Sequence, residues 1–199
     1  MVYPETLSKL IKFYKKLPSI GEKSAERLAL ATLELDDDLI AEFSQTVISS
    51  KEKLKPCSIC NNLTDCDICS ICSDESRDKR LICVIEDYKS VFSFEKAGNY
   101  RGVYHVLNGL ISPFNNIGPE DINISSLVKR VDSLEKPELI LALKSSIEGE
   151  TTTLYIKKIF EKKQVVISRL SYGIPMGAEI DYLDTLTLDK ALDDRKKIS

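Results

Sequence analysis

The sequence contains no tryptophan, a single histidine and no long apolar run, although 43% of its 199 residues are hydrophobic. A transmembrane helix needs about 20 consecutive apolar residues, and no apolar run in the sequence approaches that length. The histidine, His105, lies within the apolar segment 103–107, which favours a buried strand residue over a catalytic acid or base. The sequence also lacks a Gly-x-x-x-x-Gly-Lys loop, so nothing in it supports ATP hydrolysis.

The chain as a whole has no excess of positive charge. The formal net charge is -3 and the isoelectric point is about 5.4, so nucleic-acid binding would have to depend on a local basic cluster. The first residues do not resemble a signal peptide, and we therefore expect a cytoplasmic protein with reduced thiols. A length of 199 residues suits one to two small domains with a hydrophobic core.

Cysteine is the residue type whose spacing is most informative. Cys57/Cys60 and Cys69/Cys72 form two CxxC pairs, a spacing typical of a closed tetrahedral zinc site that serves structure and not catalysis. Disulfides are the alternative, which a reducing compartment disfavours. Cys66 and Cys69 also form a CxxC pair, so spacing alone leaves open which four sulfurs bind.

A basic cluster lies in residues 1–30, where six Lys or Arg outnumber three Glu. Apolar spacing predicts helices over 7–17 and 25–33, with Pro18 ending the first. The connection over 17–25 resembles the helix-hairpin-helix DNA-binding motif, although Ser19 replaces the usual first glycine. The resemblance implies that Lys23, Arg27 and backbone N–H groups after Gly21 bind phosphates without reading bases. An ordinary helical hairpin with a solvated basic face is the alternative.

A third amphipathic helix should follow residues 36–38 and run toward residue 55. From residue 80 the pattern changes to strands over 81–86, 102–107, 138–143 and 164–168, which alternate with helices over 87–97, 124–134 and about 150–162. This alternation predicts an α/β domain with a parallel sheet covered on both faces.

Acidic residues follow two of the predicted strands, at the sheet edge where ligands gather. Glu86 ends the strand over 81–86, and Glu148 and Glu150 open the helix after the strand over 138–143. Their carboxylates are suited to Mg²⁺, or they merely complement a helix N-terminus. The arrangement resembles a Toprim domain, which binds Mg²⁺ for phosphoryl transfer, although the later motif here is Glu-x-Glu in place of Asp-x-Asp.

The order of these parts resembles the RecR family of bacterial recombination mediator proteins over essentially the whole chain. Matching stretches cover 57–72, 106–109, 112–113, 117–119, 148–150 and 168–177. The resemblance implies a helix-hairpin-helix region over 1–55, a zinc finger over 56–79, a Toprim domain over 80–168 and a Walker-B-like oligomerisation segment over 169–199. It also implies that zinc binds Cys57, Cys60, Cys69 and Cys72, and that Cys66 is not a zinc ligand.

The resemblance implies a non-enzymatic clamp that binds double- and single-stranded DNA without sequence preference and assembles as a homotetrameric ring. Such proteins act with RecO, and in many bacteria RecF, to help RecA displace single-strand-binding protein at gaps. Lys144 and Ser145 depart from the family's Asn-Pro, and Lys144 weakens the expected Mg²⁺ site. Two other classes compete: a Mg²⁺-dependent Toprim nuclease or nicking enzyme that uses the three glutamates, and a zinc-stapled interaction module without a DNA role.

Overall fold

The computed structural model describes residues 3–171, 174 and 177–195. It separates into two compact units, Met1–Lys53 and Leu54–Ser199, which are described here one at a time. Part of the predicted oligomerisation segment, residues 172–173, 175–176 and 196–199, lies outside the described residues. None of the described helices is long and apolar enough to cross a membrane.

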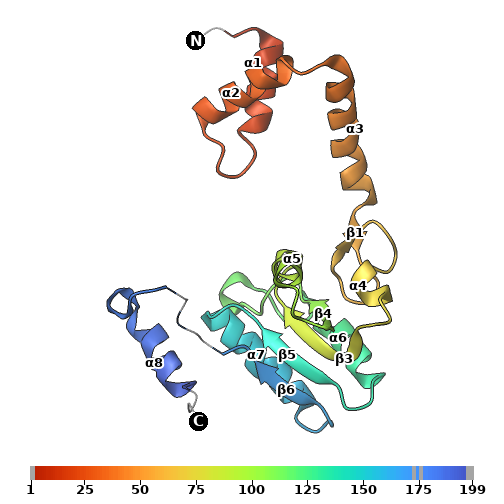
Figure 1. Cartoon of the computed structure of the whole chain (residues 1–199), viewed down its shortest axis with the longest axis vertical. Coiled ribbons are helices and arrows are strands. Elements are labelled where there is room, and N and C mark those ends of the chain that lie inside the picture. The colour runs from red at the N-terminus through yellow and green to blue at the C-terminus, as the bar shows by residue number, and fades with distance from the viewer. Residues whose placement is uncertain (1–2, 172–173, 175–176, 196–199) are drawn as a thin grey trace. The chain divides into compact units, whose positions relative to one another are not determined.

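The first unit consists of helices α1 (Glu5–Tyr14), α2 (Glu22–Leu33) and α3 (Asp37–Lys53) (Figure 1). Ile11 of α1 packs on Ala25 and Ala29 of α2, all three buried, and the two small alanines let the helices approach closely. The hydroxyl groups of Tyr14 and Thr32 lie 2.5 Å apart and tie the same pair of helices together. The predicted helical hairpin is therefore present.

The second unit begins with a small cysteine-rich segment. Strand β1 (Lys55–Pro56) pairs antiparallel with β2 (Leu63–Thr64), and the short helix α4 (Ser70–Ser73) follows. This segment is too short and polar to bury an apolar core of its own, since the buried group at its centre is made of cysteines.

A four-stranded parallel sheet forms the rest of the core. Its strands are β3 (Asp78–Ile85), β4 (Gly102–Val106), β5 (Glu138–Ala142) and β6 (Val166–Arg169), in the order β4-β3-β5-β6. Helices α5 (Tyr88–Ala97), α6 (Ile124–Asp132) and α7 (Ile147–Phe160) connect them. The predicted alternation of strands and helices is confirmed, with ends that differ by a few residues.

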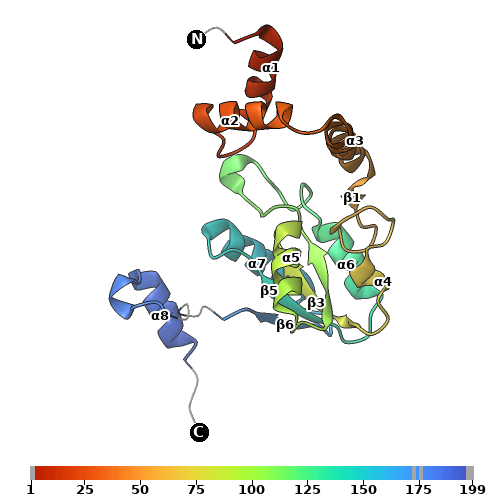
Figure 2. The ribbon, with the colours of Figure 1, turned by 45° about the horizontal axis from the view of Figure 1, so that its top comes forward.

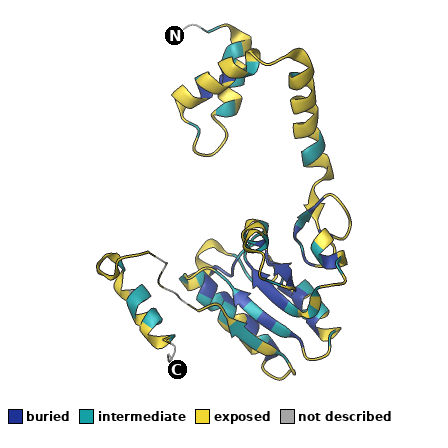
Figure 3. Cartoon of the chain, viewed as in Figure 1, coloured by how far each residue is buried: buried dark blue, intermediate teal, exposed yellow. Residues whose placement is uncertain are grey.

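The helices cover the two faces of this sheet unequally. The chain moves from β3 to β4 in one direction and from β4 through β5 to β6 in the other, so right-handed crossovers place α5 opposite α6 and α7. Leu127 and Phe160 belong to the larger cluster under α6 and α7, whereas Val91 of α5 packs over β3 and β4. Val166 on β6 stays 61% exposed, so the prediction of cover on both faces holds for the central strands and not for this edge (Figure 3).

The remaining short elements lie in connections and near the C-terminus. The 3₁₀ helix η1 (Pro113–Asn115) lies in the long β4–α6 loop, and η2 (Ile180–Tyr182) and α8 (Thr185–Asp193) follow the sheet. Figure 2 shows that the β4–α6 loop projects beyond the ends of the strands, on the same side as the start of α7.

Candidate functional site

Four cysteine sulfurs meet at the centre of the cysteine-rich segment. The Sγ atoms of Cys57, Cys60, Cys69 and Cys72 all lie within 4.8 Å of one another, and Cys60 Sγ lies 3.5 Å from Cys69 Sγ. Sulfurs that share one zinc ion at about 2.3 Å are about 3.8 Å apart, so the spacing fits that ion. Cys66 is exposed, lies outside the group and has its Sγ 3.5 Å from an Asp65 carboxylate oxygen.

The buried sulfurs strongly perturb one another's protonation. A hydrogen bond between the two side chains raises the pKa of the Cys60 thiol and lowers the pKa of Cys69, because one sulfur donates the proton that the other accepts. A divalent cation stabilises thiolates in place of such shared protons. The donor set is soft, buried and closed, which suits zinc and leaves no position for a substrate.

Backbone hydrogen bonds place these cysteines at tight turns. The Cys57 N–H donates to the Asn62 carbonyl at 2.7 Å, the Asn61 N–H donates back to Cys57 at 3.0 Å, and Asn61 adopts a left-handed φ of 59°. The Cys69 N–H donates to the Cys57 sulfur at 3.3 Å. Such N–H···S contacts stabilise a thiolate, so the turns orient the sulfurs and favour their metal-binding form.

The cysteine-rich segment is held against the sheet domain. The Val106 N–H donates to the Cys60 carbonyl at 2.8 Å, which attaches one turn to the end of β4. Lys79 at the start of β3 donates to the carbonyls of Cys72, at 2.9 Å, and of Asp74. No sequence pattern points to this lysine, because its role depends on where the last turn of the segment ends in space.

The turn between α1 and α2 has the geometry of a phosphate-binding hairpin. Ser19 has a left-handed φ of 65°, which explains why this motif usually has glycine there. Gly21 caps α2 without a side-chain hydrogen bond, so the first N–H groups of that helix stay available to an anion.

Lys23 and Arg27 are both exposed and lie four residues apart on one face of α2. Neither forms an ion pair with another described residue, whereas Lys9 pairs with Glu5 and Lys15 pairs with Glu22. The two α2 cations are therefore not neutralised within the described part of the chain.

The acidic residues lie where two adjacent strands end. Ile85 pairs with Ala142 at the last position of the β3–β5 ladder, so Glu86 follows β3 at the same edge from which the chain enters α7. Glu148 lies in the first turn of α7. A hydrogen bond from its own N–H, one from Ser146 and the charge of Lys144 lower the pKa of its carboxyl group.

Glu150 has its own partner at this edge. Arg169 at the end of β6 donates from Nη1 to its two carboxylate oxygens at 3.2 and 3.4 Å. Gly149 lies between the two glutamates, where a Cβ atom would be only 1.8 Å from the Lys144 carbonyl oxygen. A glycine is therefore required, and the Glu-Gly-Glu sequence fits the tight first turn of α7.

The three glutamates do not gather as metal ligands do. Over the described residues, the cysteines are the one group of three or more ligating side chains whose donor atoms lie together. The sequence predicts that these glutamates lie at one edge of the sheet. It does not indicate Arg169, because an arginine at the end of a short strand belongs to no recognisable motif.

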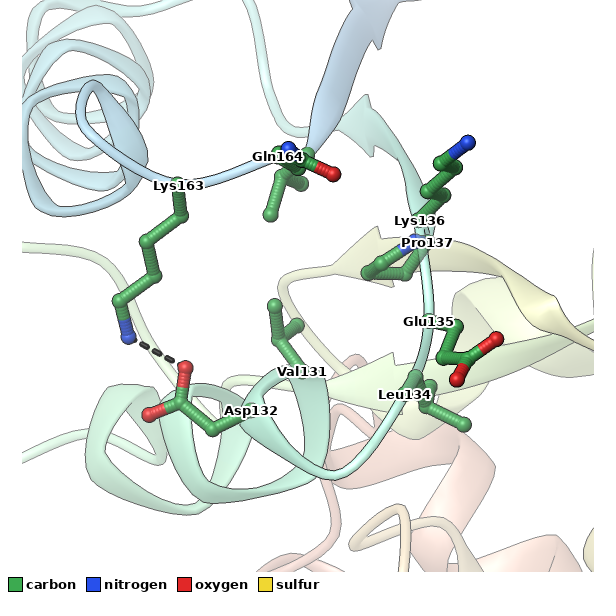
Figure 4. A pocket seen from close by; sticks show the side chains of 9 residues that line it. Val131, Asp132, Leu134, Glu135, Lys136, Pro137, Lys163 and Gln164 are labelled. Carbon is green, nitrogen blue, oxygen red and sulfur yellow. Dashed lines mark hydrogen bonds and ion pairs between the residues drawn. The ribbon is translucent and has the colours of Figure 1, made fainter.

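A hollow of about 450 Å³ opens at the opposite end of the sheet, beside Pro137 and Val165, which precede β5 and β6 (Figure 4). The ammonium group of Lys163 pairs there with Asp132. Ligands of parallel sheets bind at the carboxyl ends of strands, so this hollow is not the candidate site.

Family models match the chain in four consecutive parts. They are the RecR helix-hairpin-helix over residues 7–50, the RecR four-cysteine zinc finger domain over 54–74, a Toprim domain over 80–171 and the RecR C-terminal part over 173–196. Recombination protein RecR from Staphylococcus aureus strain Mu3 is 45% identical over 198 residues, which covers 100% of both chains. The chain belongs to the RecR family. The RecR protein of strain Newman is 44% identical over the same length.

Membership of the RecR family gives the three sites their context. The four clustered cysteines belong to a four-cysteine zinc finger, and the hairpin that carries Lys23 and Arg27 belongs to a helix-hairpin-helix part. The acidic edge is the carboxyl edge of a Toprim domain. A role of this RecR-family protein in recombinational repair follows from its full-length similarity.

Proposed function

We propose that the protein is a non-enzymatic, cytoplasmic DNA clamp that acts with RecO, and with RecF where it is present, to load RecA onto gapped or single-stranded DNA. The observation that carries the proposal is full-length similarity, at 45% identity, to recombination protein RecR. The three separate sites support a mediator, since a mediator must bind DNA and a protein partner at the same time.

DNA binding is assigned to the α1–α2 hairpin. The N–H groups after Gly21 and the cations of Lys23 and Arg27, which pair with no described carboxylate, share the start of α2 and suit a phosphate backbone. These groups contact phosphates and read no base edges, so the proposed binding to double- and single-stranded DNA is independent of sequence.

Zinc is assigned to the four clustered cysteines, with Cys66 outside the shell. The closed set of four sulfurs makes the metal structural: it holds the finger that is bound to β4 and Lys79. We divide the chain near residues 55, 79 and 168, close to the points between residues 50 and 54, 74 and 80, and 171 and 173 where one family model gives way to the next. The last segment is assigned to oligomerisation.

The acidic edge is assigned to RecO docking and not to hydrolysis. Arg169 already pairs with Glu150, and the charge of Lys144 acts on Glu148, so these two cations offset part of the negative charge that would attract Mg²⁺. Exposed carboxylates steer a basic protein surface and make its association sensitive to salt. Assembly as a homotetrameric ring would bring several such edges to one DNA.

The test is RecA loading on single-stranded DNA coated with single-strand-binding protein, followed by the DNA-dependent ATP hydrolysis of RecA. We expect the protein and RecO together to shorten the lag, and neither to do so alone. A variant with Lys23→Ala and Arg27→Ala should lose this effect. Mg²⁺-dependent cleavage of DNA by the purified protein, lost in a Glu148→Ala/Glu150→Ala variant, would overturn the proposal in favour of a nicking enzyme.

A further inference from the structure

The β4–α6 loop displays an aromatic side chain that is almost fully exposed. Phe114 in η1 is 95% exposed, more than any other large apolar side chain for which the described residues give a value. Single exposed apolar residues are common on protein surfaces, so exposure alone decides nothing. Phe114 differs from such residues because hydrogen bonds hold its loop and carboxylates lie nearby.

The loop that holds Phe114 is built rigidly. The backbones of Ser112 and Ile117 exchange two hydrogen bonds of 3.0 Å, and the Asn115 amide donates to the Ser112 hydroxyl at 2.9 Å. Ser112 and the preceding Ile111 are buried. The aromatic ring is therefore presented on a fixed support, and binding would lose little conformational entropy at this position.

A second exposed apolar side chain lies at the end of α7 to which this loop is attached. Ile147 is the first residue of α7 and is 84% exposed. The Ile111 N–H donates at 2.9 Å to the Thr152 hydroxyl, which itself donates at 2.7 Å to the Glu148 carbonyl. The buried threonine thus joins the loop to the first turns of α7, and Figures 1 and 2 both show the two segments side by side.

The charge beside these two apolar groups is negative. The loop over 108–121 contains Glu120 and Asp121 and no Lys or Arg, and its Gly109 N–H donates to the Glu86 carbonyl at 3.2 Å. Glu148 follows Ile147 directly. Cations lie at this edge as well. The charge of Lys144 acts on Glu148, Arg169 pairs with Glu150, and Lys190 of α8 borders the same hollow as Ile147 and Glu150.

The exposed apolar side chains and the neighbouring carboxylates together indicate which class of molecule could bind here. Nucleic-acid phosphates and anionic lipid headgroups would be repelled by the carboxylates, and so would the same edge of a second copy. A protein surface with a basic rim and an apolar pocket is complementary to both features.

We propose that Phe114 and Ile147 are the apolar anchors of a protein-docking surface at the acidic edge, and that its occupant is a basic protein surface with an apolar pocket. The inference rests on the proposed function, because RecO is the partner assigned to that edge. Buried apolar anchors slow dissociation, whereas charges at the rim mainly set the association rate and its salt dependence.

The test measures association and dissociation rates of RecO on the immobilised full-length protein at low and high salt. Phe114→Ala and Ile147→Ala should each raise the dissociation rate about tenfold and leave the association rate unchanged. Glu148→Gln should lower the association rate at low salt. Phe92→Ala, which removes an exposed aromatic ring of α5, is the matched control and should change neither rate.

The other possible results distinguish failure of the apolar anchors from failure of the proposed docking site. Unchanged dissociation rates in both apolar variants, with weakened binding in Glu148→Gln, would refute the anchors and retain RecO docking. Unchanged binding in every variant would refute the docking site of the proposed function itself. A Phe114→Ala protein that binds RecO normally but loses affinity for single-stranded DNA, or assembles into a smaller oligomer, would assign the loop to DNA or to a second copy and overturn the inference.

Discussion

His105 shows how one side chain couples stability to pH. Its Nε2 donates to the Asn123 carbonyl at 2.9 Å, while Nδ1 is buried and has no hydrogen-bond partner among the described residues. Burial lowers the pKa of His105 to about 4, since a charged imidazole would lose its hydration. The site, between β4 and α6, therefore requires the neutral ring.

We predict that this histidine destabilises the fold in acid. The folded pKa of about 4 is below the ordinary value of 6.5, so the unfolded chain binds the proton first. The free energy of unfolding is therefore highest above pH 6.5 and falls as the pH drops toward 4. His105 alone should account for a loss of about 3 kcal/mol over this range. Urea unfolding across that range should show the loss in the parent protein and a smaller loss in His105→Gln, which keeps the Nε2 donor. Acid release of zinc affects both proteins and cancels in the comparison.

Ser19 provides a second prediction for a single residue. Its left-handed φ of 65° strains a side chain with a Cβ atom, so Ser19→Gly should stabilise the first unit by about 0.5 to 1 kcal/mol. Denaturant unfolding followed by circular dichroism measures the change. Ser49→Gly within α3, where the backbone is helical, should instead destabilise by a similar amount. Equal effects of the two substitutions would mean that the turn carries no strain.

Among the structural elements, the zinc finger depends on its metal. Cys72→Ser removes one of the four clustered sulfurs and should lose most of the bound zinc and unfold the finger, because metal binding and folding are the same event in so small a segment. Cys66→Ser is the matched control, since that sulfur is exposed and outside the cluster. Zinc content by mass spectrometry tests both. Loss of zinc from Cys66→Ser with retention in Cys72→Ser would contradict the assignment.

Helix α2 gives a prediction about salt. Lys23→Ala and Arg27→Ala should each weaken DNA binding at any sequence and lower the slope of log affinity against log salt by about one unit. Lys9→Ala is the control, because it removes the same charge from α1, where Lys9 already pairs with Glu5. Fluorescence anisotropy over a range of salt concentrations measures the slopes. A slope that does not change in the double variant would favour an interaction module without a DNA role.

At the scale of the whole molecule, the exposed apolar face of α3 favours association between copies of the chain. None of its residues is buried, yet Phe43 and Val47, one turn apart, are 49% and 55% exposed. An amphipathic helix whose apolar face stays exposed within its unit is expected to find a partner in another subunit. This feature supports the homotetrameric ring that we propose.

We predict that Phe43→Glu lowers the mass of the oligomer, because it places a charge on the apolar face of α3 that we expect to contact another subunit. Size-exclusion chromatography with light scattering, with and without DNA, measures the mass. Gln45→Glu adds the same charge on another face of α3 and should leave the assembly intact. An identical mass for the two variants would show that α3 is not an interface.

Features that depend on neighbouring residues can be predicted from the sequence. Apolar spacing specified α1, α2 and the strand-helix alternation, and Gly98 ended α5 as expected, in a left-handed φ of 72°. Paired cysteine spacing pointed to zinc, but Cys66 made two sets of sulfurs possible, and only a resemblance to a family selected one of them. Local periodicity is sufficient in the first cases because the alternation of side-chain directions along a helix or a strand can be recognised within a single segment.

Features that depend on segments far apart in the chain needed the folded structure. Folding placed Arg169 beside Glu150, exposed Cys66 and left Phe114 projecting from the β4–α6 loop. It also left one face of β6 open, because the hand of the crossovers puts α6 and α7 together on the other face. None of these outcomes leaves a pattern in a short stretch of sequence, since each is set by the position of residues that only folding brings together.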